Sequence, residues 1–367
     1  MKIIRLSKSC LGDSEKSAVM RVLDEEYLGM GLEVQEFEKL LTRFFGRPVV
    51  CVSSGTDALQ LSLHAIGVSI GDEVLVQSLT YVASFQAISS TGATPVACDV
   101  DPDTLCIDLK DAEKRLTKKT KAIMPMHYSG NVGELEKVYT FASKHNLRVI
   151  EDAAHAFGSE YQGKKVGGFG DVACFSFDGI KNITSGEGGC ITSNDKGLLQ
   201  KVRDSRLLGV EKDTEKRYSR ERSWEFDVTE QGFRCHMSNI MAAIGIVQLG
   251  RIDEFRIRKQ EVSQKYIEGL KDIKEIDFFD FNFKEIIPHI FVIKAKDREG
   301  LRKYLILNGV ECGVHYKPNH LLSKYLSKYK LPITEKIYSK ILTLPCHNSL
   351  DVIEQNKVIS TIKNFYE

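Results

Sequence analysis

The chain has 367 residues, of which 42% are hydrophobic, and its 51 basic and 50 acidic side chains leave a net charge of +1. This length allows two domains, or one large domain with a smaller annex, and the balanced charge does not favour a nucleic-acid-binding surface. The nine cysteines form no Cys-x-x-Cys pair, and there is no signal peptide or membrane-spanning window, so we expect a cytoplasmic protein with free thiols.

Short apolar runs alternate with helical patterns through the first two thirds of the chain. Helices are predicted at 13–29, 33–45, 58–66, 81–91, 108–116, 135–145 and 195–208. Strands are predicted at 49–52, 74–76, 96–100, 122–126, 147–150, 172–175 and 190–192. This alternation predicts an α/β domain with a mostly parallel sheet flanked by helices.

The last part of the chain has a different pattern. Residues 211–225 are dense in charge and predict an exposed, mobile excursion, either a solvated loop or a lid over an anionic substrate. One long helix is expected over 240–270. Further strands are expected at 290–293 and 311–316, and further helices at 298–307 and 352–365. We therefore expect a large domain over 1–249 and a small C-terminal α+β domain over 250–367.

A polar turn, Ser53-Ser54-Gly55-Thr56-Asp57, follows the strand at 49–52 and begins a helix. Such a turn presents free backbone N–H groups and the positive end of the helix dipole, which suits a phosphate. Ordinary helix capping by Ser or Thr is the alternative, and it is the more common role for such a turn.

Lys181 lies in a second loop of small residues, which joins the apolar runs 172–175 and 190–192. A lysine in this setting can hold an aldehyde cofactor as a Schiff base, or it can be an ordinary surface lysine. Asp152 ends another strand, where its carboxylate could pair with a protonated ring nitrogen or cap a helix. His155 follows it, either against the same ring or as a structural histidine. Because ligands collect at the carboxyl ends of parallel strands, these residues and His127 can share one rim.

Several catalytic and binding motifs are absent from the sequence. It contains no Gly-x-Gly-x-x-Gly after a strand, no Gly-x-x-x-x-Gly-Lys-Ser/Thr and no Gly-x-Ser-x-Gly. No His-Glu-x-x-His occurs, and Cys312 and His315 have no partner pair, so no metal site is expected.

Four motifs in one order resemble the nucleotide-sugar aminotransferases of the DegT/StrS group. They are Ser53-Ser54-Gly55-Thr56, Glu151-Asp152-Ala153-Ala154-His155, Ser176-Phe177 through Lys181-Asn182 to Gly186-Glu187-Gly188-Gly189, and Ala242-Ala243-Ile244-Gly245 through Gln248-Leu249. The resemblance covers nearly the whole chain. It implies the aspartate-aminotransferase fold (fold type I) and pyridoxal 5′-phosphate (PLP) as the cofactor.

The resemblance also implies roles for individual residues. Lys181 matches the Schiff-base lysine, Asp152 the carboxylate on the pyridine nitrogen, and Tyr81 the aromatic residue that stacks on the ring. Gly55, Thr56 and Ser176 match phosphate contacts, and His155 matches a His or Gln near the cofactor.

Two regions complete the site that the resemblance implies. His320 matches a histidine near the sugar, often reached from the partner subunit, and Tyr316 is assigned to the substrate with it. Relatives often carry Gly-Tyr-Asn-Tyr-Arg before the long helix, where this chain has Arg234 and His236. Arg234 is therefore a departure, carried over as a hypothesis for binding phosphate. The family acts as a homodimer with active sites at the interface.

The expected activity is transfer of an amino group from L-glutamate to a keto group of a nucleotide-linked deoxyhexose, with Lys181 moving the protons. The residues around Lys181 resemble those of family members that act at C-4 more than those that act at C-3. The expected substrate is therefore dTDP-4-keto-6-deoxyglucose, for surface polysaccharide or O-antigen synthesis. A 3-keto sugar aminotransferase and a non-catalytic regulatory protein are the alternatives. A sugar dehydratase of the same fold would carry histidine in place of Lys181.

Overall fold

A seven-stranded sheet organises the first part of the chain in the computed structural model, which describes residues 3–222, 224–327 and 329–367. Its strand order is β1-β9-β8-β5-β4-β2-β3. Strand β9 runs antiparallel to both of its neighbours, whereas the other adjacent pairs are parallel. The predicted mostly parallel α/β architecture is confirmed.

The bounds of the elements follow the chain. The strands are β1 Val49–Val52, β2 Glu73–Gln77, β3 Thr94–Cys98, β4 Thr120–Met124, β5 Arg148–Asp152, β6 Glu160–Tyr161, β7 Lys164–Lys165, β8 Val172–Ser176, β9 Gly189–Ser193, β10 Ile276–Asp277, β11 Phe291–Ala295 and β12 Ile341–Leu344. The helices are α1 Asp13–Asp24, α2 Leu32–Phe45, α3 Gly55–Ala65, α4 Val82–Ser90, α5 Leu109–Arg115, α6 Leu135–Lys144, α7 Lys196–Ser205, α8 Asp213–Tyr218, α9 Asn239–Gly250, α10 Ile252–Leu270, α11 Arg298–Leu307, α12 Pro332–Tyr338 and α13 Val352–Tyr366.

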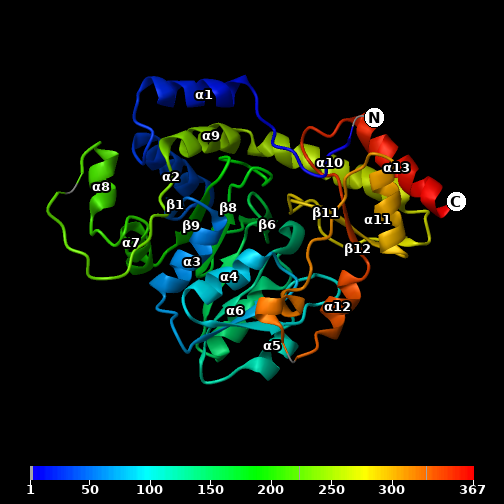
Figure 1. Ribbon diagram of the computed structural model, residues 1–367, viewed down its shortest axis with the longest axis horizontal. Helices are drawn as coiled ribbons and strands as arrows, with labels where there is room; N and C mark the ends of the chain where they lie inside the picture. Colours follow the sequence, from blue (N-terminus) through cyan, green and yellow to red (C-terminus); the bar gives the residue numbers. More distant parts are fainter. Residues whose placement is uncertain (1–2, 223, 328) are drawn as a thin grey trace.

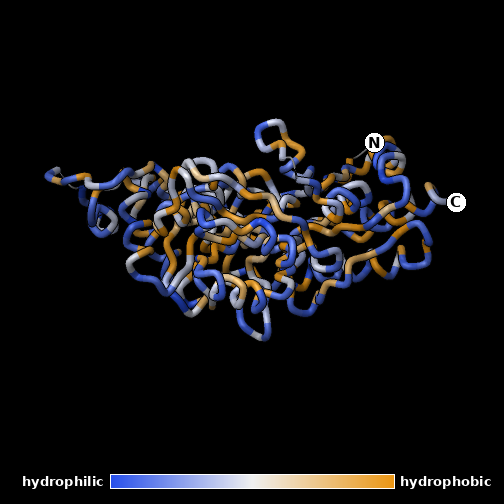
Figure 2. Tube along the Cα trace, turned by 90° about the horizontal axis from the view of Figure 1, so that it is seen from below, coloured by the Kyte–Doolittle hydropathy of each residue, from blue (hydrophilic) through white to orange (hydrophobic). Residues whose placement is uncertain are grey.

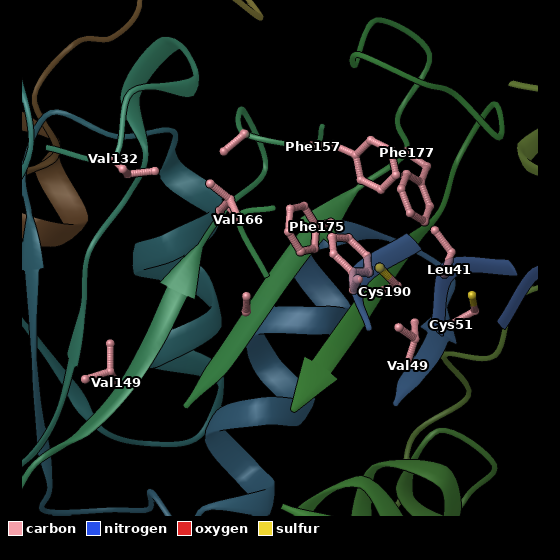
Figure 3. Packing of buried hydrophobic residues seen from close by; sticks show 14 of the residues in the cluster. Leu41, Val49, Cys51, Val132, Val149, Phe157, Val166, Phe175, Phe177 and Cys190 are labelled. Carbon is pink, nitrogen blue, oxygen red and sulfur yellow. The ribbon is translucent and has the colours of Figure 1, made fainter. Parts of the chain in front are cut away.

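The large sheet is buried on both faces, which explains its continuous apolar strands. Alternate residues of β1 enter opposite clusters: Val49 and Cys51 pack on one side, Val50 and Val52 on the other. The first side holds a group of phenylalanines around β8 and β9 (Figure 3). Seen edge-on, the apolar segments are concentrated in the interior (Figure 2). Because both faces of the sheet are packed, the strands have fixed positions, and so do the residues at their ends.

A separate three-stranded antiparallel sheet, β10-β11-β12, forms a second core with α10, α11 and α13. Figure 1 shows this part at the right, beside both chain ends. Ile4 belongs to its core and pairs with Val310, although the sequence places residue 4 in the first domain. The expected division at 249/250 falls at the break between α9 and α10 and stays a prediction.

Three local expectations were wrong. The helix expected at 13–29 ends at Asp24. The expected single helix over 240–270 is two helices, α9 and α10, that meet at Arg251. Residues 311–316 form only an isolated bridge, Gly313 to Thr343, instead of a strand.

The charged excursion over 211–225 contains helix α8, at the outer left of Figure 1, and most of its described residues are exposed, as predicted. Its mobility stays a prediction. It contacts the large domain through Tyr218, whose hydroxyl donates to Glu38 and accepts from the guanidinium of Arg206. Ser223 lies outside the described residues. Among the described helices, none combines the length and apolar character that a bilayer crossing requires.

Candidate active site

A cavity of about 480 Å³ opens where β1, β5 and β8 end. It is lined by Ser54, Gly55, Thr56, Leu59, Tyr81, Ala83, Met126, Asp152, Ala154, His155, Cys174, Ser176, Asp178, Ile180, Lys181, Glu187, His289, His315 and Tyr316. The three loops singled out in the sequence therefore share one rim, as parallel strands require.

One end of the cavity is the N-terminus of α3. Ser54 caps this helix, and its hydroxyl accepts the backbone N–H of Asp57 at 3.0 Å. A Cβ on Gly55 would lie 2.6 Å from Cβ of Ser176, so only glycine lets the turn approach the end of β8. The turn and the Ser176 hydroxyl thus form a cradle of neutral donors at the positive end of a helix, which suits a phosphate group.

Asp152 lines the cavity and is only 4% exposed. Its carboxylate accepts hydrogen bonds from the hydroxyl of Ser84, at 2.6 Å, and from the backbone N–H of Ala154, at 3.2 Å. These two donors fix the orientation of the carboxylate. Asp152 therefore presents a fixed carboxylate to the cavity, which suits a cationic ring nitrogen.

Lys181 also lines the cavity, and its Nζ is 3.4 Å from Nε2 of His289. Burial lowers the pKa of Lys181 to about 8, against the attraction of the Asp152 and Asp178 carboxylates. The buried cation Lys259 acts in the same direction as burial. An amine with this pKa is partly neutral near physiological pH, which a nucleophile or base requires.

His155 and Tyr316 form a hydrogen-bonded pair at the edge of the cavity. The backbone N–H of Ser129 donates to Nδ1 of His155 at 3.3 Å, which assigns the ring proton to Nε2. Nε2 is 2.8 Å from the hydroxyl of Tyr316 and donates to it. Burial lowers the pKa of His155 well below its ordinary value, so the ring is neutral. Tyr316 accepts from His155 and keeps its own proton to donate into the cavity.

The structure does not bring every predicted residue together. Tyr81 lines the cavity with its ring centroid 5.6 Å from that of Tyr316. Arg234 is exposed and lies outside the residues that line the cavity. His320 is 2% exposed, and its ring is bonded to Ser78 at 2.7 Å and to Glu335 at 3.3 Å. Other side chains contact both ring nitrogens of His320, and its assignment to the substrate stays a prediction.

Sequence reasoning missed His289 and Lys259, and it saw His315 only as a metal candidate. His289 precedes β11 and is 5% exposed, and Lys259 is on α10 and is 3% exposed. Nζ of Lys259 donates to Oδ1 of Asn182 at 3.0 Å, beside the lysine of the cavity. The only signal in the sequence was a lysine on the otherwise apolar face of α10, beside Phe255 and Val262.

The described residues fit pyridoxal 5′-phosphate. The Gly55 cradle suits its phosphate, and Asp152 suits the nitrogen of its ring. Lys181, which lines the same cavity, suits its aldehyde. The volume of the cavity falls within the usual range for a small-molecule site.

Comparison with known proteins supports the same reading. The model of the DegT/DnrJ/EryC1/StrS aminotransferase family matches residues 9–363. The GDP-perosamine synthase of Escherichia coli O157:H7 is 37% identical over 100% of this chain and 99% of its own length. The spore coat polysaccharide biosynthesis protein SpsC of Bacillus subtilis (strain 168) is 32% identical, over 96% of this chain and 95% of its own.

Among solved structures, the PLP-form of Spr1654 from Streptococcus pneumoniae matches with a TM-score of 0.92 at 28% identity. The match covers 99% of this chain and 98% of that one. The family match spans nearly all of the chain and agrees with the loops, cavity and lysine described above. The chain therefore belongs to the DegT/DnrJ/EryC1/StrS aminotransferase family and is a PLP-dependent sugar aminotransferase, as its motifs predicted.

Proposed function

We propose that the protein transfers the amino group of L-glutamate to the keto group of a nucleotide-linked 4-keto-6-deoxyhexose. The observation that carries this proposal is that Lys181 and Asp152 face one cavity, with the pKa of Lys181 lowered to about 8. A buried amine that is easily neutral, lining the same cavity as a fixed carboxylate, suits proton transfer at carbon.

When bound, PLP supplies an aldehyde that takes up an amino group and a ring that accepts electrons. Asp152 keeps the nitrogen of that ring charged. Gly55, Thr56 and Ser176 hold its phosphate, and Tyr81 packs on its face. The free amine of Lys181 takes the proton from the α-carbon of glutamate in the first half-reaction. In the second half-reaction Lys181 Nζ handles the proton at the former keto carbon of the sugar, and Tyr316 donates a hydrogen bond to a substrate oxygen.

The nucleotide is proposed to be GDP. The support is the 37% identity with a relative named GDP-perosamine synthase, whereas no relative described above is named for the dTDP-linked sugar that the sequence motifs favoured. The name of the Bacillus subtilis relative supports a role in making a surface polysaccharide. We further propose a homodimer with shared active sites, in which the exposed Arg234 reaches the partner subunit's cavity.

The test incubates purified protein with PLP, L-glutamate and, in parallel, GDP-4-keto-6-deoxymannose or dTDP-4-keto-6-deoxyglucose. A third incubation contains a 3-keto sugar. NMR identifies the product of each incubation. We expect amination at C-4 of the GDP-linked sugar. Preference for the dTDP-linked or the 3-keto substrate would overturn the substrate assignment alone, and no amination of any of them would overturn the proposed function.

The Asp152→Asn variant tests whether Asp152 acts on the ring nitrogen of the cofactor or only helps to bind the cofactor. It keeps the shape of the side chain but removes its charge, so we expect kcat to fall at least about a hundredfold. The absorbance of bound cofactor should persist. Equal activity of the variant and the wild type would contradict the role of Asp152. Light scattering of the wild type tests whether the protein is a dimer. The Arg234→Ala variant tests whether Arg234 contributes to the partner subunit's cavity.

A further inference from the structure

His289 reaches the cavity from the C-terminal part of the chain and is held there by contacts with the large domain. The backbone N–H of Ile287 donates to the hydroxyl of Ser159 at 3.0 Å. The side-chain amide of Asn182, next to Lys181, donates to the carbonyl of Ile287 at 3.2 Å. On the other side of His289, the Ile290 carbonyl accepts the hydroxyl of Ser129. The backbone on both sides of His289 is thus held by residues of the large domain.

The ring of His289 makes one side-chain hydrogen bond, to the amine of Lys181. Nε2 lies 3.4 Å from Nζ, and the ring packs on that of His155 with centroids 4.2 Å apart. Its Nδ1 is buried and has no hydrogen-bond partner among the described residues. Burial and the nearby Lys181 amine lower the pKa of His289 well below its ordinary value, so the ring is neutral. It can exchange a hydrogen bond with Lys181 but carries no charge.

The direction of this hydrogen bond decides what Lys181 can do. If Nε2 donated a proton to the amine, it would occupy the lone pair that has to take the proton from the substrate. If Nε2 accepts an N–H of the amine, that lone pair can point into the cavity. Only the second arrangement is compatible with Lys181 as a base, and it places the ring proton of His289 on Nδ1.

We propose that His289 is a positioning residue whose Nε2 accepts an N–H of Lys181 whenever that amine is free, aiming the lone pair of the amine at the substrate carbon. This inference rests on the proposed function. Other groups also face Lys181: the carboxylates of Asp152 and Asp178, the cation of Lys259, and the neutral rings of His155 and His315. These groups change the electrostatic environment of the Lys181 amine, whereas His289 orients one of its N–H bonds.

Two substitutions separate acceptance of a hydrogen bond from mere packing. His289→Gln places an amide oxygen near the position of Nε2 and cannot carry a proton between groups. His289→Leu fills a similar space without an acceptor. His145→Gln, at a partly exposed histidine on the large domain, is the control for losing a ring.

The first readout uses the apoprotein and needs no catalysis. The rate at which an amine-reactive reagent labels Lys181, followed by peptide mass spectrometry across pH, gives the midpoint of its titration. The wild type, His289→Gln and His145→Gln should share one midpoint. In His289→Leu the midpoint should fall by about one pH unit, because the ammonium form loses an acceptor. An unchanged midpoint in His289→Leu, or an equal fall in His289→Gln, would overturn the proposal.

The second readout is the half-reaction with glutamate, measured above all these midpoints so that the amine is neutral in every variant. We expect kcat to fall about tenfold or more in His289→Leu, with KM for glutamate unchanged, because a misdirected base affects only the transition state. The isotope effect with glutamate deuterated at the α-carbon should rise in this variant and stay at the wild-type value in His289→Gln. Equal isotope effects in all proteins would refute the positioning role. Inactivity of the wild type would instead refute the proposed function. The labelling result would still show whether His289 accepts a hydrogen bond from Lys181.

Discussion

The two ends of the cavity are built in different ways. The end where we propose that the cofactor phosphate binds, called the phosphate end below, comes from one short turn, Ser54-Gly55-Thr56, packed on the end of β8 through Ser176. The lysine end is assembled from segments far apart in sequence, with Lys181 in one loop and His289 more than a hundred residues later. The first end offers backbone and hydroxyl donors that keep their protonation state, and the second gathers titratable groups whose pKa values burial has lowered.

This difference separates binding from chemistry. A rigid turn holds a charged group by geometry alone, so its contribution is mostly affinity. A cluster of buried amines and imidazoles gains nothing from burial itself, because burial penalises their charged forms. Its contribution is an amine that is easily neutral, which suits covalent attachment of the cofactor and proton transfer. Substitutions at the two ends should therefore change different measured quantities.

Removing the amine at the lysine end should have the largest effect. Lys181→Ala deletes the group that moves the proton, so we expect kcat to fall about ten-thousand-fold or more. The visible band of the cofactor should shift, because the covalent link to the protein is lost. Absorbance spectra and single-turnover rates check both. A variant with the spectrum and rate of the wild type would place the reactive lysine elsewhere.

Filling the phosphate end should weaken binding instead. A Cβ on Gly55 would lie 2.6 Å from that of Ser176, so Gly55→Val forces the turn and the strand end apart. Overpacking of this kind costs about 1–3 kcal/mol, which corresponds to about a ten- to hundredfold higher Kd for PLP. Fluorescence titration of the apoprotein measures it, and Gly67→Val, at an open site with positive φ, controls for loss of stability. If saturating PLP failed to restore kcat, the separation of the two ends would be wrong.

The sequence predicted the phosphate end better than the lysine end for a physical reason. The turn around Gly55 is a local strand-turn-helix unit, so its residues are neighbours in sequence as well as in space. The strand ends at Asp152 and Ser176 could also be placed on the same rim, because the sheet is parallel there.

Long-range contacts were not predictable in this way. Nothing near His289 in sequence indicates that it meets Lys181, and His320 lies within the matched region yet has its ring bonded to Ser78. The same reason explains why the contact between the excursion over 211–225 and the large domain was not predicted. Tyr218 is anchored by Glu38, about 180 residues earlier, and no local pattern reports such a contact.

The lysine end should also make stability depend on pH. Burial lowers the pKa of His315 to about 4, and the pKa values of His155 and His289 are also well below their ordinary value. In the unfolded chain these rings take up protons near pH 6.5, whereas the folded chain leaves them neutral. The free energy of unfolding should therefore fall as the pH is lowered through 6.5, by about 1.4 kcal/mol per pH unit for each such ring.

Urea unfolding of the apoprotein between pH 7.5 and 5.5 measures this slope, above the range where most carboxylates titrate. His315→Gln should remove the contribution of one ring, and Gly55→Val should leave the slope unchanged. A slope that is the same with and without His315 would show that this ring does not remain neutral in the folded chain.

Tyr316 lines the cavity beside Tyr81 and His155, and its loss should have the smallest effect. Tyr316→Phe keeps the ring beside Tyr81 but removes both the acceptor for His155 and the proton directed into the cavity. One hydrogen bond of about 0.5–1.5 kcal/mol predicts a two- to tenfold lower kcat/KM for the keto sugar, with Kd for PLP unchanged. Tyr266→Phe, which loses a hydrogen bond to the Pro345 carbonyl in the second core, is the matched control. Stopped-flow measurement of the two half-reactions then shows which oxygen Tyr316 serves. If the rate falls only in the sugar half-reaction, Tyr316 donates its hydrogen bond to the sugar substrate. An equal fall in both half-reactions would mean that Tyr316 donates to the cofactor instead.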